Sequence, residues 1–382
     1  MDGVNTGGTS RIHGLDTLRA LAVSLVVLHH YTLFVSDAPT FGWVGTMGWA
    51  GVDLFFALSG YLIGNQIFAA LRSARGFGIG RFYVRRLLRT LPNFWVVLAL
   101  YALWPAWRGA TPMLPLWHYL TFTQNIHLQP GTAFSHAWSL CIEEQFYMLL
   151  PAAAVAGAAL GRRGVRLRWA WCALLLGVVG GMVARATIWR DGQQASNWLW
   201  YYYRYIYYSS WCRCDELLAG VALALLKNRA PGAWRRVLAH GNALFAAGVA
   251  VIGAASAWFL DDHYGLAQTV AGYPLLGLGW SLLILAALAP GSPLQRVRVP
   301  GAASLALWSY AIYLTHKSVS ILVAARMARA GYGAEDGATI AACMLASLVA
   351  GWMLFVVVET PFMRLRARWE SALSPAPAPA LR

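Results

Sequence analysis

Long apolar runs, separated by short polar and basic segments, dominate the sequence. Several runs reach the roughly 20 residues that an α-helix needs to span a bilayer. Hydrophobic residues make up 59% of the 382 residues and charged residues 12%, whereas soluble domains average about 25% charged residues. The pattern predicts an all-α, polytopic transmembrane helix bundle. About ten spans are expected, at residues 15–35, 49–70, 91–107, 137–160, 169–188, 211–227, 241–260, 267–289, 302–325 and 338–360.

The basic residues predict how these spans are oriented. Most of the 30 Lys and Arg fall in segments that are cytoplasmic if both termini lie inside. The net charge of +15 therefore follows the positive-inside rule and does not call for a nucleic-acid partner. We expect a flexible N-terminus (1–10), a transmembrane domain (11–368) and a disordered, Pro- and Ala-rich tail (369–382), with no cleavable signal peptide and no soluble domain after the last span.

The first apolar span contains two costly polar residues, Arg19 and His30. Eleven residues on a helix return to nearly the same face after a rise of roughly 16 Å. Arg19 would therefore lie at the cytoplasmic side and His30 deeper, on the same face. A histidine titrates near pH 6.5 and suits a base for a hydroxyl. The alternative is a histidine that is simply hydrogen-bonded in the bundle, and His29 points about 100° away.

A basic cluster, Arg85, Arg86 and Arg89, is expected at the cytoplasmic start of the third span. Guanidinium groups bind phosphates in a fork geometry, so the cluster suits a phosphorylated ligand. Ordinary positive-inside anchoring or contact with lipid headgroups explains it equally well.

Two adjacent carboxylates, Glu143 and Glu144, are expected at the outer start of the fourth span. They diverge around the helix, so only one needs to face inward, and Ser139 shares the face of Glu143. Helix capping is the alternative explanation, because the macrodipole favours acidic residues at a helix start.

Other polar groups within the spans are Asp53, His316 with Lys317, Glu359, and Arg213 with Asp215 and Glu216. We expect a structural ion pair between Arg213 and Asp215 or Glu216. The aromatic run at 198–208 predicts a belt at the outer membrane interface, with a stacking platform for sugars as the alternative. Cys212 and Cys214 form only a weak metal signal, so no metal is predicted.

Five motifs in order resemble acyltransferase family 3, a family of integral membrane proteins. The resemblance extends over residues 11 to 363. The motifs are the Arg-x10-His opening (Arg19 to His30), the second-helix signature (51–63), the arginine motif (81–92), the Ser-Leu-x-x-Glu-x-x-Phe-Tyr box (139–147), and the closing segments 309–316 and 359–361. Three departures are His29 before His30, Arg-Thr-Leu-Pro at 89–92, and Thr315 where a tryptophan is usual.

The resemblance implies an O-acyltransferase of the stand-alone type in the bacterial inner membrane. Such enzymes move an acyl group, most often acetyl, from acyl-CoA to a hydroxyl. The acceptor implied is a cell-surface glycan or its lipid-linked precursor, with peptidoglycan, other lipids or macrolides as further acceptors in the family. Besides membrane lipids, the expected partners are acetyl-CoA and this acceptor, while the oligomeric state is open.

These expectations combine into one mechanism. Arg85, Arg86 and Arg89 bind the CoA phosphates, the pantetheine arm passes Arg19, and His30 takes the hydroxyl proton of the acceptor. Glu143 or Glu144 orients His30 or the acceptor, and Tyr147 or Ser139 stabilises the oxyanion. Asp53 and His316 are further candidate site residues. The alternatives are a proton-coupled transporter or flippase, although no internal repeat is evident, and an acyltransferase that uses a succinyl or longer acyl donor.

Overall fold

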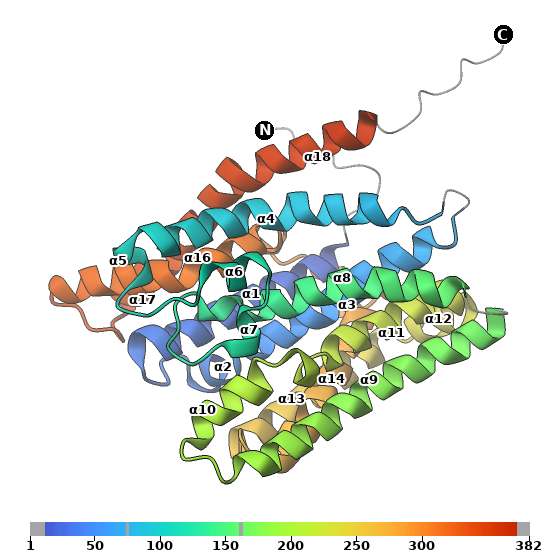
Figure 1. Cartoon of the computed structure of the whole chain (residues 1–382), viewed down its shortest axis with the longest axis horizontal. Coiled ribbons are helices and arrows are strands. Elements are labelled where there is room, and N and C mark those ends of the chain that lie inside the picture. The colour runs from blue at the N-terminus through green and yellow to red at the C-terminus, as the bar shows by residue number, and fades with distance from the viewer. Residues whose placement is uncertain (1–11, 74–75, 160–162, 373–382) are drawn as a thin grey trace.

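The computed structural model describes residues 12–73, 76–159 and 163–372, and these residues form an all-helical bundle without strands (Figure 1). The segment 1–10 and most of the predicted tail, residues 373–382, lie outside the described residues. Each predicted span coincides with a long helix. These helices are α1 (His13–Tyr31), α3 (Ala50–Ala70), α4 (Ile79–Leu103), α8 (Trp138–Ala159), α9 (Arg163–Gly192), α11 (Asp215–Arg229), α13 (Gly241–Asp261), α14 (Tyr273–Leu288), α16 (Ala302–Arg329) and α17 (Gly337–Leu354).

Shorter elements connect or extend these helices. The short α-helices are α2 (Gly42–Met47), α5 (Pro105–Arg108), α6 (Leu116–Leu120), α7 (Gln124–His127), α10 (Trp198–Tyr202), α12 (Pro231–Leu238), α15 (Pro293–Arg296) and α18 (Thr360–Ala372). The π-helices are η1 (Thr32–Ser36), η3 (Tyr203–Tyr207), η5 (Gln268–Gly272) and η6 (Phe355–Glu359), and the 3-10 helices are η2 (Ser135–Ala137) and η4 (Ser210–Cys212).

Six helical segments among the described residues are long and apolar enough to cross a membrane. They are His13–Ser36, Ala50–Ala70, Leu167–Gly192, Gly241–Asp261, Gln268–Leu288 and Gly337–Ala372. The helices α4 and α8 carry charged residues in their first halves, α16 carries polar residues along its length, and α11 is short. The chain is a polytopic helical membrane protein, and ten spans with both termini inside stay a prediction.

Two predicted spans differ from the observed helices in their boundaries. The third was expected at 91–107, but α4 begins at Ile79 and ends at Leu103, because Trp104 is extended ahead of Pro105. The arginine motif therefore occupies the first half of this helix, and Pro92 lies inside it. The sixth span was expected from 211, but the helix α11 begins only at Asp215.

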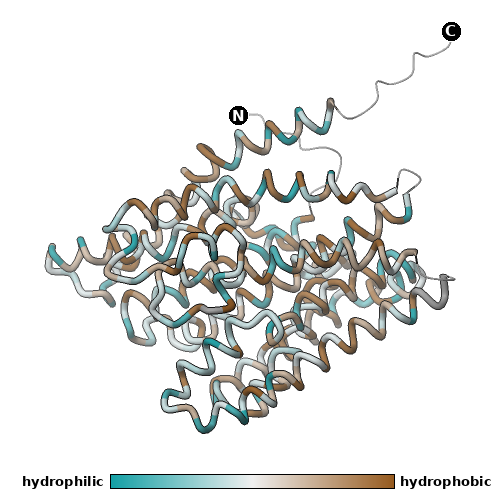
Figure 2. Tube along the Cα trace, in the orientation of Figure 1, coloured by the Kyte–Doolittle hydropathy of each residue, from teal (hydrophilic) through white to brown (hydrophobic). Residues whose placement is uncertain are grey.

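The helices α1 and α3 occupy the centre of the bundle (Figure 1). α1 packs against α3, α14 and α16, and α3 packs against α11. The helices α9 and α13 lie on one side, where Figure 2 shows many apolar residues. Leu175, Leu176 and Val183 of α9 are exposed, as expected of side chains that face lipid.

Glycines bring α3 and α11 into close contact. A Cβ atom on Gly60 would overlap the backbone carbonyl oxygen of Leu217, and one on Gly220 would overlap that of Ala57. Small residues at such crossings let helix backbones approach closely within a membrane. This contact fixes α11, and the charged residues at its N-terminus, against the centre of the bundle.

Charged residues at the start of α11 form two buried ion pairs. Arg213 pairs with Asp53 of α3, and Arg185 of α9 pairs with Asp215 at 2.5 Å. The prediction that Arg213 pairs with Asp215 or Glu216 is therefore wrong: Cys214 separates Arg213 from the helix, so its side chain extends toward α3 instead. Rings surround the Arg213 guanidinium at 4.1 to 5.3 Å, namely those of Trp138, Tyr207 and Tyr273.

The aromatic run at 198–208 folds as α10 and η3 and contributes much of its surface to the core. Tyr202, Tyr207 and Tyr208 are buried, whereas Trp200 and Tyr205 are exposed. The predicted interface belt is therefore confined to part of the run, because the π-helical turn rotates the remaining rings inward.

The connection between α4 and α8 folds back over one end of the bundle. It carries α5, α6, α7 and η2, and α5 contacts α16 (Figure 1). Its last turn contains Phe134, which is buried and has a left-handed backbone with φ of 57°. Such a conformation is uncommon for a bulky residue and indicates a tightly constrained segment. It sets the direction of the next residues, Ser135 and His136.

Candidate active site

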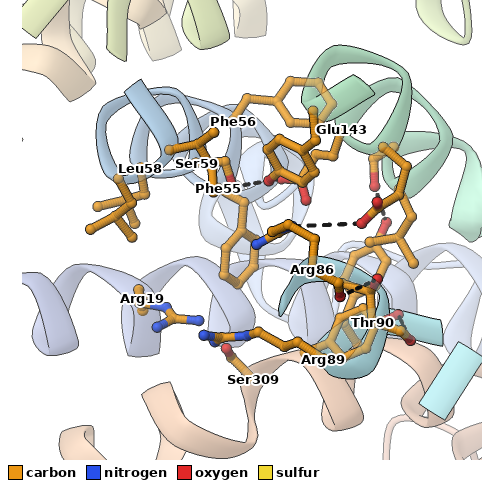
Figure 3. A pocket seen from close by; sticks show the side chains of 18 of the residues that line it. Arg19, Phe55, Phe56, Leu58, Ser59, Arg86, Arg89, Thr90, Glu143 and Ser309 are labelled. Atoms are coloured by element: carbon orange, nitrogen blue, oxygen red, sulfur yellow. Dashed lines mark hydrogen bonds and ion pairs between the residues drawn. The ribbon is translucent and has the colours of Figure 1, made fainter. Parts of the chain in front are cut away.

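A cavity of about 140 Å³ lies among α1, α3, α4, α8 and α16. Figure 3 shows side chains from these helices converging on it. We call it the arginine pocket. It brings together a large part of the predicted site, namely Arg19, Arg86, Arg89, Ser139, Glu143, Glu144 and Tyr147. Because Ser59 and Tyr313 also line it, residues from all five motifs contribute to one cavity.

Arg86 is held on two sides within this pocket. Its guanidinium lies 3.9 Å from the ring centroid of Tyr147, and Nη2 lies 3.6 Å from a carboxylate oxygen of Glu144. Stacking and an ion pair restrict the side chain to one orientation. Arg86 is therefore a fixed positive charge at the pocket wall.

Arg19 and Arg89 form the most unusual contact in the pocket. Their guanidinium groups point toward one another in Figure 3. Neither has an ion-pair partner within the described part of the chain, although Asp16 interacts electrostatically with Arg19 and Glu359 interacts with both. Two like charges that face each other in a partly buried cavity are unfavourable alone and are stabilised by a bound anion. The geometry therefore fits an anionic group between them.

Arg85 does not join the predicted cluster. Its Nε lies 2.8 Å from a carboxylate oxygen of Glu370 on α18, and almost half of the side chain is exposed. Adjacent residues on a helix point about 100° apart, so Arg85 and Arg86 face different partners. The structure thus brings Arg86 and Arg89 of α4 together with Arg19 of α1, and Arg85 lies outside the pocket lining.

The paired glutamates also differ from expectation. They lie within α8 rather than at its start, since the helix begins at Trp138. Ser59 donates a 2.9 Å hydrogen bond to Glu143, and Glu144 pairs with Arg86. The expected orientation of His30 by a glutamate is therefore not present: both carboxylates face the arginine pocket.

His30 lies in a cluster of imidazole rings instead. Its Nδ1 is 2.6 Å from Nε2 of His316, and the two rings are parallel with centroids 4.9 Å apart. The ring of His136 lies 5.9 Å from that of His30 and 5.5 Å from that of His316. His29 points elsewhere, and its Nδ1 lies 2.9 Å from the carbonyl oxygen of Gly45. The structure thus separates the two neighbouring histidines of the first span.

A lysine borders the histidine cluster. Lys317 Nζ donates a 3.1 Å hydrogen bond to Ser135 and lies 4.0 Å from the ring centroid of Phe34. His136, in the loop outside the spans, is almost fully buried. Burial and the nearby Lys317 ammonium lower the pKa of His136 well below its usual range, so its imidazole is neutral at pH 7.

Tyr313 connects the two groups of residues. It lines the arginine pocket, and its hydroxyl lies 2.6 Å from Ser139 Oγ and donates to the carbonyl oxygen of His136 at 2.5 Å. Its ring centroid is 5.9 Å from that of His316. The arginine pocket and the histidine cluster therefore meet at one tyrosine of α16.

Several residues of this arrangement escaped the sequence reasoning. Ser59 and Tyr313 lie inside the motifs and His136 lies just before one, but none of the three has a distinguishing spacing. Only the packing of α3, η2 and α16 brings them to the site. Asp53 was expected as a site residue, but its ion pair with Arg213 places it outside the pocket lining. No group of three or more metal-ligating side chains occurs among the described residues.

The helical fold and this polar cavity define an integral membrane protein with a buried, arginine-lined site. Residues 12–357 match the family described as an acyltransferase domain, acyltransferase family 3, and the chain belongs to this family. The resemblance inferred from the motifs is confirmed.

Two relatives illustrate the similarity. YrhL of Bacillus subtilis (strain 168), named as a candidate peptidoglycan O-acetyltransferase, is 28% identical over 342 residues, which is 81% of this chain and 49% of the relative. Peptidoglycan O-acetyltransferase OatA of Listeria monocytogenes is 27% identical over 238 residues, which is 56% of this chain and 34% of the relative. The chain spans between a third and a half of the length of these relatives. No solved structure matches.

Proposed function

We propose that this protein is a membrane O-acetyltransferase that moves an acetyl group from acetyl-CoA to a hydroxyl of a cell-surface glycan or its lipid-linked precursor. The observation that carries the proposal is the pair Arg19 and Arg89, two facing guanidinium groups that form no ion pair among the described residues. The phosphate groups of acyl-CoA are anions that such a site can bind. The acyl-transfer reaction is inferred from membership of the family.

The donor end of the site is the arginine pocket. Arg19, Arg86 and Arg89 bind phosphate oxygens of CoA through charge-assisted hydrogen bonds. Glu144 and Tyr147 hold Arg86 in place, so the pocket is partly ordered before the donor arrives. Ser59 and Glu143 offer hydrogen bonds to the amides of the pantetheine arm.

The acceptor end is the histidine cluster. His30 takes the proton of the acceptor hydroxyl as its oxygen attacks the thioester carbonyl. The C–S bond then breaks, and the CoA thiolate takes the proton from His30, so the base is regenerated and no acyl-enzyme is required. The Lys317 ammonium lies beside the cluster and stabilises negative charge on the thioester oxygen.

The names of the relatives support a glycan as the acceptor, since OatA is a peptidoglycan O-acetyltransferase. With both termini inside, the His30 end of α1 lies at the outer face of the bacterial cytoplasmic membrane and the start of α4 lies inside. The donor would then enter from the cytoplasm and the acceptor from the other side.

The test is acetyl transfer by purified protein in nanodiscs, measured as CoA released per added glycan acceptor. Arg89→Ala should raise KM for acetyl-CoA about 10- to 100-fold, because a hydrogen bond to a charged group contributes about 1.5–3 kcal/mol. Arg85→Ala is the matched control on the same helix, and its KM should stay within about twofold of the native value. His30→Ala should lower kcat about 100- to 10,000-fold with little change in KM.

Equal effects of Arg89→Ala and Arg85→Ala on KM would refute the claim that the arginine pocket binds acetyl-CoA. Full activity in His30→Ala would refute the role of His30 as the general base. A protein that moves a polar solute but never releases CoA would support the transporter instead. Mass spectrometry of surface glycans from a deletion strain then identifies the acceptor.

A further inference from the structure

A short chain of hydrogen-bonding atoms runs through the histidine cluster. Nδ1 of His316 lies 3.0 Å from the carbonyl oxygen of Ile312, one turn earlier on α16. Nε2 of His316 lies 2.6 Å from Nδ1 of His30. His316 has only 1% of its surface exposed, so water does not compete for either contact.

This order of atoms fixes where the protons are. A carbonyl oxygen can only accept, so the proton of neutral His316 must sit on Nδ1 and point at Ile312. Nε2 of His316 then has a lone pair and accepts from Nδ1–H of His30. The remaining nitrogen of His30, Nε2, is left without a proton and is the basic atom.

Among the described residues, none of the other side chains around His30 accepts a hydrogen bond from its Nδ1–H. His29 uses its Nδ1 on Gly45, and His136 approaches Leu314 with its Nε2 at 3.4 Å. Lys317 is a donor and contacts Ser135. Within the described part of the chain, no carboxylate bonds to His30, and its Nε2 has no hydrogen-bond partner.

We propose that His316 is a positioning residue that holds His30 in the tautomer whose Nε2 is free to accept a proton. The inference rests on the proposed function, in which His30 is the base. An acceptor hydroxyl gives its proton to Nε2 as its oxygen attacks the acyl carbon. The imidazolium that forms keeps its Nδ1–H bonded to Nε2 of His316, and Nε2 of His30 then passes its proton to the departing thiolate.

Without His316, His30 is free to carry its proton on Nε2, the atom that must accept one. His316→Leu should therefore lower kcat by about 10- to 100-fold, the loss found when the partner that orients a functional histidine is removed. KM for acetyl-CoA should stay unchanged, because the arginine pocket is untouched. The acid limb of the pH–rate profile should move to lower pH, since the imidazolium loses an acceptor.

His316→Gln separates positioning from packing. A glutamine can place its amide oxygen near the former Nε2 position and accept from His30, so it should recover most of the kcat lost in His316→Leu. Both variants should show native membrane levels and melting temperatures within a few degrees of each other. A loss of kcat that glutamine does not relieve, with an unshifted pH profile, would leave His316 a purely structural residue.

Nitrogen NMR of histidine-labelled protein reads the tautomer directly. His29, His30 and His316 should each carry the proton on Nδ1, as their assignments through His29→Gln and His30→Gln would show. In His316→Leu the signal of His30 should change to the Nε2–H tautomer, while that of His29 stays as an internal reference.

The outcomes distinguish the two proposals. If His30→Ala is inactive and His316→Leu is fully active with an unchanged His30 tautomer, the positioning role is refuted and the base remains. If His30→Ala keeps full activity, the base itself is refuted, and the tautomer of His30 then has no bearing on catalysis.

Discussion

The buried pair of Asp53 and Arg213 predicts an asymmetric loss of stability. Both side chains have 0% of their surface exposed. Glu216 lies close enough to interact electrostatically with Arg213, and its two carboxylate oxygens are buried without a hydrogen-bond partner among the described residues. Arg213 therefore interacts with two acidic side chains, Asp53 and Glu216, whereas Asp53 forms its ion pair with Arg213 alone.

The magnitudes follow from what each substitution leaves behind. Arg213→Met leaves the buried Asp53 carboxylate without its ion-pair partner and removes a positive charge from beside Glu216. It should cost about 3–5 kcal/mol, as when one partner of a buried ion pair is removed. Asp53→Asn keeps a hydrogen-bond acceptor and leaves Arg213 beside Glu216, so about 1–3 kcal/mol is expected. The double variant should be more stable than Arg213→Met alone, because one uncompensated carboxylate is gone.

The assay is thermal unfolding of the detergent-solubilised protein, followed by size-exclusion of the surviving fraction. At about 2 °C per kcal/mol, Arg213→Met should lower the apparent Tm by about 6–10 °C. Arg85→Met is the control, since an exposed ion pair contributes about 0–1 kcal/mol. Equal losses in Asp53→Asn and Arg213→Met, or a double variant less stable than Arg213→Met, would refute the reasoning.

Three further outcomes are expected. Gly60→Ala should lower the melting temperature by several degrees, because its Cβ would overlap the Leu217 carbonyl oxygen, whereas Gly80→Ala, with open space around it, should leave it unchanged or raise it. His29→Ala should keep acetyl transfer within a few-fold of the native rate, while His30→Ala loses it; the reverse order would show that the neighbouring ring is the base. Glu370→Ala should leave KM for acetyl-CoA unchanged, since it frees Arg85 outside the pocket; a large rise would mean that α18 shapes the donor site.

Much of the helical architecture was predictable, because the length of each apolar run indicates where a long helix lies. Each predicted span lies on a helix, and Arg19, Arg86, Arg89, Glu143 and Glu144 do meet in one pocket. The resemblance, through the order of five motifs, gave the family before any packing was known.

The pairing of polar groups was not predictable, because it depends on how helices pack across the bundle. Sequence neighbours suggested that Arg213 bonds to Asp215 or Glu216, yet Arg213 lies outside the helix and meets Asp53, 160 residues earlier. His316 similarly meets His30 across 286 residues. Helical periodicity assigns a face to each residue, but it does not say which other face lies opposite.

The position of Tyr313 and His316 on α16 has a geometric consequence. One residue lines the pocket proposed for the donor, and the other contacts the proposed base, within a single helical turn. The axial distance between the residue at the donor pocket and the residue at the base is therefore about 4.5 Å, the rise of three residues along the helix. The helix itself sets this distance, without the closure of a loop. The helix α16 thus fixes the relative position of the two side chains. Inserting a single residue between Tyr313 and His316 would rotate one side chain by about 100° relative to the other, so the two could no longer face the pocket and His30 at the same time.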